Sequence, residues 1–253
     1  MRSTLAWKTI VATLALLLTP HLQAVAQQPV SEQELAIAHN VSRMLQSARA
    51  VISSKQDLIN DPAGGDKGLT GKVVLDEALA RFREAGGADP ATIDPSTYEG
   101  RLLKALMDSV VEVVDDNQET INAQGIGFKG FIPATFARLV TEAFSRRVGD
   151  EASIKVTAPP ELVRNRQSRP DEWEAAAIRD YLQSVDWPKG QVYSGHDAAG
   201  GKIARIMIPE YYAESCLTCH GSPKGEMDIT GYPKEGASAG DLGGIISIRL
   251  LPQ

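Results

Sequence analysis

Apolar side chains recur at three- and four-residue steps through the first part of the chain, which is the period of helices that bury one face. The pattern predicts helices over residues 31–59, 74–85, 98–121 and 134–146. Ser31 and Glu34 stand in the spacing of a capping box at the start of the first helix. Pro133 suits the first turn of the fourth. We therefore expect a helical N-terminal portion, residues 27–150.

After residue 150 the pattern changes to an alternation of apolar and polar side chains, which is the period of a half-buried strand. The alternation is clearest at Ile246, Ile248 and Leu250, which are separated by polar residues. Strands are expected over 154–156, 191–194, 202–208 and 244–250, with one more helix from 170 to about 184. The chain therefore belongs to the α+β class, and we expect residues 151–253 to form one continuous domain with residues 27–150.

The first 26 residues have the features of a secretory signal. Arg2 and Lys8 give a positive start, an apolar run follows over 9–18, and small residues stand at Ala24 and Ala26. The apolar run is shorter than the roughly 20 residues that a membrane-spanning helix needs. We therefore predict cleavage after Ala26 and a periplasmic mature protein, with an uncleaved membrane anchor as the alternative.

Acidic residues outnumber basic ones, 32 to 26, and the net charge is −6 at pH 7. Removal of Arg2 and Lys8 with the signal increases the acidic excess. A negative net charge disfavours binding to nucleic acids and to anionic membrane surfaces. The chain also shows no Ser/His/Asp arrangement and no glycine-rich phosphate loop, so we expect no intrinsic catalysis.

Both cysteines of the chain lie in the segment Ser215-Cys216-Leu217-Thr218-Cys219-His220-Gly221. The spacing C-x-x-C-H is the attachment signature of c-type haem. Two thiols three positions apart on a helical turn can each add to one vinyl group of the same porphyrin, and the next residue, His220, is then carried under the ring. The sequence therefore predicts one covalent haem c on Cys216 and Cys219, with His220 as the proximal iron ligand.

Three other uses of this segment remain open. A thiol–disulfide redox pair usually follows a strand in a βαβ unit, whereas these cysteines lie near the C-terminus between expected strands. A structural zinc site needs about four ligands, and only His196 and two distant acidic loops are available to complete it. A local disulfide would close a loop too short to stabilise the fold appreciably.

The chain also resembles a known family, the PAS-like haem c domains of bacterial periplasmic proteins, long catalogued as a domain of unknown function. The resemblance rests on six segments in order over about the last 100 residues: Val163-Arg164-Asn165-Arg166, Pro170-Asp171-Glu172-Trp173-Glu174, Arg205-Ile206-Met207-Ile208-Pro209, Cys216 to Gly221, Asp228-Ile229-Thr230-Gly231-Tyr232-Pro233 and Gly243-Gly244-Ile245-Ile246-Ser247. It is less specific over the preceding helices. Together these segments are stronger than the C-x-x-C-H spacing alone.

The resemblance implies a PAS-like antiparallel sheet flanked by helices, with the haem-attachment loop after the central strands and near the C-terminus. Members of the family are free-standing or form the sensor portions of membrane-bound kinases and chemoreceptors. This sequence has no transmitter domain, so a signal would pass to another protein in trans. In some relatives an N-terminal Cys is the second axial ligand, but this chain has no third Cys.

The sixth coordination position of the iron therefore needs another occupant. Met44 lies on the apolar stripe of the first helix, where a Met is more often core than ligand. His39 lies on the opposite face of that helix. His196, expected in a solvated hairpin turn, and Met207, on the same side of its strand as Arg205, are weaker candidates. An open or water-bound position is the remaining possibility.

The haem propionates need positive or hydrogen-bonding partners. Arg164, Arg166 and Arg205 are the candidates, because a guanidinium pairs with a carboxylate in fork geometry. For each of the three residues, the role of an ordinary surface arginine remains an equal alternative.

Two classes of function fit these expectations. One is a redox or gas-sensing module, in which a change of iron oxidation state or a diatomic ligand is passed to a signalling protein, with a homodimer possible through the N-terminal helix. The other is an electron-transfer cytochrome that serves a periplasmic redox partner, which a closed sixth position would favour.

Overall fold

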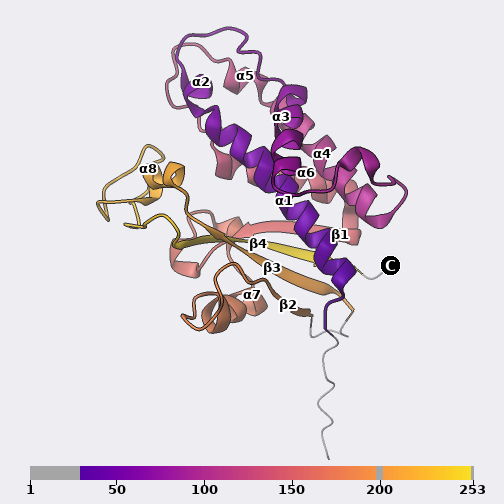
Figure 1. The fold of residues 1–253 in the computed structure, drawn as a ribbon. Helices are drawn as coiled ribbons and strands as arrows, with labels where there is room; N and C mark the ends of the chain where they lie inside the picture. The colour runs from indigo at the N-terminus through magenta and orange to yellow at the C-terminus, as the bar shows by residue number, and fades with distance from the viewer. Residues whose placement is uncertain (1–28, 198–201, 252–253) are drawn as a thin grey trace, which may run out of the picture.

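A computed structural model of the chain describes residues 29–197 and 202–251, with the side chain of residue 91 left out. The expected signal segment lies outside the described residues. The fold is α+β, as predicted, and contains one four-stranded antiparallel sheet (Figure 1). The strands lie in the order β1 (Ala152–Thr157), β4 (Leu242–Leu250), β3 (Ala204–Tyr211) and β2 (Tyr193–His196).

Most helices come from the first part of the described chain, as the apolar periodicity predicts. They are α1 (Glu32–Ser54), α2 (Gln56–Asn60), α3 (Gly71–Glu84), α4 (Tyr98–Asp116), α5 (Gln118–Ile121), α6 (Pro133–Val148), α7 (Glu172–Ala177) and α8 (Leu217–His220). The capping box is confirmed, since the side chain of Ser31 accepts from the backbone of Glu34 and the Glu34 carboxylate accepts from that of Ser31. Pro133 is in the first turn of α6.

Two of the expected long helices are wrong in their extent, because each is interrupted by one residue. The helix expected over 31–59 is divided at Lys55, where φ is −101° and ψ is 9°. Directly after that break, the Gln56 amide donates to the carbonyls of Ile52 and Phe131. In the helix expected over 98–121, Asn117 similarly donates its side-chain amide to the carbonyl of Val113. Such side-chain bonds compete with the helical backbone pattern.

The sheet is covered on both faces. On one face, residues such as Ile206 and Ile248 are fully buried and join the core formed by the long helices, and α1 and α6 contact the strands directly. On the other face, Met207 and Ile245 pack against α7 and the short π-helical turn Ile178–Leu182 that continues it. Figure 1 shows the long helices and α7 on opposite sides of the sheet.

Side-chain hydrogen bonds also join the helical part to the sheet. The hydroxyl of Tyr98 on α4 donates to the carbonyl of Glu151, just before β1, at 2.6 Å. Arg49 and Gln46 of α1 both donate to Glu210 on β3. The helices and the sheet thus share one buried core. Among the described residues, no helix combines the length and the apolar character needed to cross a membrane.

Replacing Ile206 by Ala tests this shared core. Ile206 is fully buried on the central strand β3, facing the helices. We expect the free energy of unfolding, measured by urea titration, to fall by about 2–5 kcal/mol, because the truncation leaves a cavity. The control is Val185→Ala, whose side chain is 99% exposed and which should change the value by less than about 0.5 kcal/mol. Equal effects of the two substitutions would contradict the shared core.

Candidate functional site

The C-x-x-C-H segment forms a single helical turn at the end of a short connection from β3. The connection includes the 3-10 turn Glu214–Cys216, and α8 then spans Leu217–His220. Both cysteines are free thiols and partly exposed. Residues three positions apart on a helical turn lie on the same side, so Cys216 and Cys219 can both reach one ligand. Figure 1 shows α8 at the left edge of the molecule, far from the N-terminal end of α1.

The imidazole of His220 is held by two side chains. Its Nδ1 lies 2.9 Å from Oε2 of Glu235, and its ring stacks on that of Tyr212 with 4.8 Å between centroids and 28° between planes. The Tyr212 hydroxyl is 3.4 Å from the same Nδ1. The His220 side chain is 29% exposed. The ring is therefore fixed in orientation while part of it stays accessible.

Glu235 is ionised at neutral pH. Burial raises its pKa, but hydrogen bonds from Arg164 and His220 outweigh burial, so the pKa of Glu235 lies below its ordinary value. An ionised carboxylate only accepts hydrogen bonds. Nδ1 of His220 must therefore carry the proton, which leaves the Nε2 lone pair available in a neutral imidazole.

Arg164 connects the residues around His220. Its Nε and one terminal nitrogen donate to the two oxygens of Glu235 at 2.9 and 3.0 Å. The same cation donates to Asp228 at 2.7 Å and to the carbonyl of Cys219 at 2.9 Å. The guanidinium also lies 5.4 Å from the ring centroid of Tyr232. Arg164 thus joins the segment before α7 to the C-x-x-C-H turn and to the loop that follows it.

Asp228 anchors that loop through a side chain that is withdrawn from solvent. Its carboxylate accepts from Arg164, from the Thr230 hydroxyl and from the backbone of Thr230 and Tyr232. Burial raises the pKa of Asp228, but these hydrogen bonds reverse the effect and hold it far below the ordinary value. Burial, followed by the charge of Asp228, raises the pKa of the Cys219 thiol. This thiol therefore stays protonated at neutral pH.

Tyr212 is seated by close packing against β4. A Cβ added to Gly243 would lie 2.6 Å from a carbon of the Tyr212 ring, so only glycine leaves room for the ring there. The backbone of Tyr212 bonds to Asp241 and to Gly240, which brings the end of the loop back to the end of β3. Burial raises the pKa of Tyr212 to about 12, and the hydroxyl stays neutral.

A second support for the segment comes from α1. Arg49 pairs with Glu210 at the end of β3, and Gln46 donates to the same carboxylate at 3.1 Å. The first long helix therefore contacts the strand that leads into the C-x-x-C-H turn.

The structure brings four of the predicted site residues together and separates two of the predicted arginines from them. Cys216, Cys219 and His220 share one turn, and Arg164 bonds to the carbonyl of Cys219. Arg205 lies on the α7 face of the sheet, where it donates to Asp171 at 2.6 Å and its guanidinium carbon is 4.4 Å from the ring centroid of Trp173. Arg166 is exposed in a short 3-10 turn.

The four candidates for the sixth ligand lie in different parts of the fold. Met44 is fully buried in the main core, and Met207 is fully buried on the α7 face. His39 is exposed in the first half of α1. The expectation that His196 is solvated in a turn is wrong, because it is the last residue of β2, pairs with Ala204 of β3, and is only 7% exposed.

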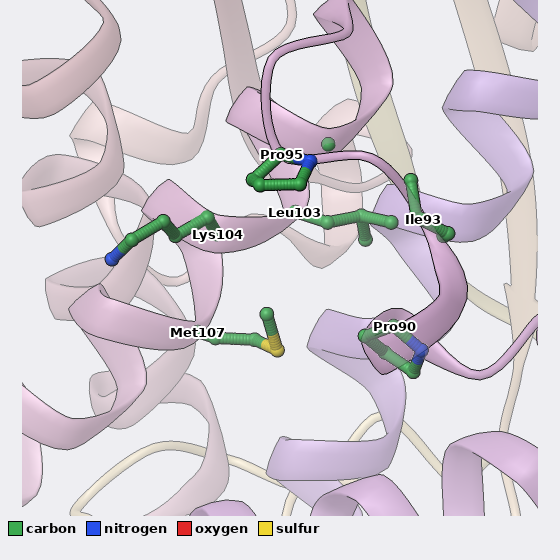
Figure 2. A pocket seen from close by; sticks show the side chains of 7 residues that line it. Pro90, Ile93, Pro95, Leu103, Lys104 and Met107 are labelled. Carbon is green, nitrogen blue, oxygen red and sulfur yellow. The ribbon is translucent and has the colours of Figure 1, made fainter.

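A pocket of about 270 Å³ lies elsewhere, between α4 and the segment that precedes it. Figure 2 shows its apolar lining, with Met107 and Leu103 of α4 facing Pro90 and Ile93. The one charged side chain of the lining, Lys104, pairs with Asp108. This pocket contains none of the predicted site residues. Within the described part of the chain, no group of three or more His, Cys, Asp or Glu side chains is arranged to hold a metal ion.

Sequence reasoning missed Glu235, and it considered Asp228 only as part of a motif. Asp228 carries a local signal, because Asp-x-Thr is a spacing in which a carboxylate can accept from the backbone two residues on. Glu235 carries no comparable signal. It lies 15 residues after His220 and 71 after Arg164, and only the closed loop brings the three together.

The model of the Tll0287-like family matches residues 26–250. Neither the curated proteins nor the solved structures gave a match.

Substitution Asp228→Asn tests the anchoring of the loop. We expect it to lower the free energy of unfolding at pH 7 by about 1–3 kcal/mol, because Arg164 loses a charged partner. The pKa of Asp228 is depressed in the folded state, so its contribution is present above the unfolded pKa of about 3.9 and is lost as the pH falls further. The gap between variant and parent in urea titrations should therefore narrow from pH 7 to pH 3.

The matched control is Asp180→Asn, which removes an exposed carboxylate paired with Arg179. An exposed pair contributes little to stability, and this control should unfold like the parent at both pH values. Equal urea midpoints for Asp228→Asn and the parent at pH 7 would contradict the anchoring role.

Proposed function

The chain belongs to the Tll0287-like family, and we propose that it is an exported PAS-like haem c protein, with one haem attached to Cys216 and Cys219 and His220 as proximal iron ligand. We propose further that it is a redox or gas-sensing module of the periplasm. The observation that carries the proposal is the hydrogen bond between His220 Nδ1 and Glu235. Iron-binding histidines commonly donate their other ring nitrogen to a carboxylate or a carbonyl in this way.

The residues present fit a covalently held haem. The two thiols are free, partly exposed and three positions apart on one turn. His220 follows directly, and because its Nδ1 is bonded to Glu235, Nε2 is the ring nitrogen left to bind iron. When bound, a haem supplies one-electron redox chemistry and an iron atom at which a small ligand can bind. This chain contributes the attachment, the orientation of the proximal imidazole and the charges behind it.

The same geometry disfavours a thiol–disulfide redox role. Redox-active C-x-x-C pairs are typical of a βαβ setting. Here the segment follows the third strand of an antiparallel sheet instead.

The positions of the candidate sixth ligands favour sensing over simple electron transfer. Met44 and Met207 are fully buried in packed clusters, and His196 is buried at the end of β2. Reaching an iron atom beside His220 would require these side chains to leave their packing. We therefore propose a sixth position that is open, or held by water, and accessible to a diatomic ligand.

A route for the signal is available through α1. This helix contacts β3 through Arg49 and Glu210, and β3 leads into the C-x-x-C-H turn. A change of charge or ligation at the iron would act on this turn and hence on the packing of α1. A signalling protein or redox partner in trans would detect that change.

Covalent attachment is tested with a Cys216→Ser/Cys219→Ser double variant. The chain is produced with its export signal in a host that matures haem c. We expect the parent to gain the mass of one haem and to retain haem in a denaturing gel, and the double variant to lose both properties. Ser215→Ala, at the exposed neighbouring position, should behave like the parent. A colourless parent without added mass would overturn the proposal and favour a thiol-exchange role.

The open sixth position is tested by adding carbon monoxide to the reduced, haem-loaded protein. We expect the absorption spectrum to shift, because the gas occupies a site that no side chain holds. The volume-conserving variants Met44→Leu and Met207→Leu, and His39→Ala, should leave the spectrum unchanged. A sharp low-spin spectrum that ignores the gas would instead support an electron-transfer cytochrome.

A further inference from the structure

We infer that Glu235, backed by Arg164, is a positioning residue. It fixes the tautomer of His220 and increases the electron donation of this imidazole to a bound iron. This inference rests on the proposed haem function and extends it, because it assigns the reduction potential of the site to a residue outside the C-x-x-C-H motif. Its consequence is a potential lower than that of the same site with a neutral acceptor behind the imidazole.

The Glu235 carboxylate is held through both of its oxygens. Glu235 Oε2 lies 2.9 Å from Nδ1 of His220, and Oε1 of the same carboxylate accepts from Nε of Arg164 at 2.9 Å. Both oxygens are thereby held, and the carboxylate cannot rotate away from the imidazole without breaking the fork with Arg164. Fork-shaped arginine–carboxylate pairs restrict geometry in this way.

The charged groups behind His220 carry a net negative charge. Two carboxylates, Asp228 and Glu235, surround the single guanidinium of Arg164. These three groups together carry one net negative charge. Glu235 is the member that contacts the imidazole, and its side chain is largely withdrawn from solvent. Charges interact more strongly where water is excluded. A carboxylate that accepts a hydrogen bond from Nδ1 raises the basicity of Nε2. It thereby stabilises the more oxidised, more positive state of a bound iron.

The His220 ring has little freedom to leave its contact with Glu235. Tyr212 stacks on His220, and the tight space at Gly243 holds Tyr212 in place. The carbonyl of Cys219 also accepts from Arg164. The same cation therefore supports both the carboxylate behind the imidazole and the turn that carries it.

The experiment compares Glu235→Gln with the matched control Glu226→Gln. The glutamine at 235 can still accept from Nδ1 through its neutral oxygen, so the variant removes the charge and keeps an acceptor. Glu226 lies in the same loop and pairs with Lys234, but it has no contact with His220 among the described residues. Redox titration of the haem-loaded protein should give a positive shift of midpoint potential for Glu235→Gln and none for Glu226→Gln.

Two further readouts separate positioning from a general effect of charge. Nitrogen NMR of the haem-free chain should show the Nδ1–H tautomer of His220 in the parent and a mixture of tautomers in Glu235→Ala. In the reduced, haem-loaded protein, the iron–histidine stretching frequency should fall in Glu235→Gln. Glu235→Asp retains the charge and should keep the potential nearer to that of the parent, which also controls for misfolding of the glutamine variant.

The outcomes distinguish the two proposals. A parent that takes up no haem overturns the proposed function, and the tautomer measurement alone then judges the positioning role. A parent that binds haem, with the same potential and stretching frequency in Glu235→Gln, overturns this inference and leaves the proposed function intact.

Discussion

The site depends on one cation that is shared by two carboxylates. Arg164 bonds to Glu235, Asp228 and the Cys219 carbonyl, so it connects the segment before α7, the C-x-x-C-H turn and the loop after it. Without this cation, two carboxylates would stand close together beside a partly buried imidazole, an arrangement that electrostatics disfavours. The closed form of the loop and the orientation of His220 are therefore two consequences of the same network.

The sheet gives this network a rigid base. β3 lies between β4 and β2 and is covered by the long helices on one face and by α7 on the other. The turn that carries the cysteines follows directly from the end of this strand, and Tyr212 and Asp241 join the two ends of the loop there. A site supported by a doubly covered strand keeps its geometry better than one on a free loop. The contact of Arg49 with Glu210 extends that support to α1.

Burial on both faces also explains why most of the methionine and histidine candidates for a second iron ligand are poorly placed. In a strand that is covered on both faces, successive side chains point alternately into the packed layer on one face and the packed layer on the other. Met207 therefore faces α7, while the residues beside it in β3 face the helices. The same packing leaves the accessible side of His220 without a neighbouring methionine from these strands. This is the physical basis for preferring a sensing role over a closed electron carrier.

Features that depend on short spacing along the chain follow from the sequence alone. The apolar periods predicted the α+β class and the main helices and strands, the Ser31 cap was correct, and the two cysteines and His220 stand together because they are adjacent in the chain. Features that depend on residues far apart in the chain arise only in the folded protein. Gln56 bonds to Phe131 where the first helix is interrupted, His196 is buried by pairing with β3, and Glu235 reaches His220 only because Arg164 closes the loop. Contacts between residues far apart in the chain leave no periodic signal, since the folded backbone alone sets their distance.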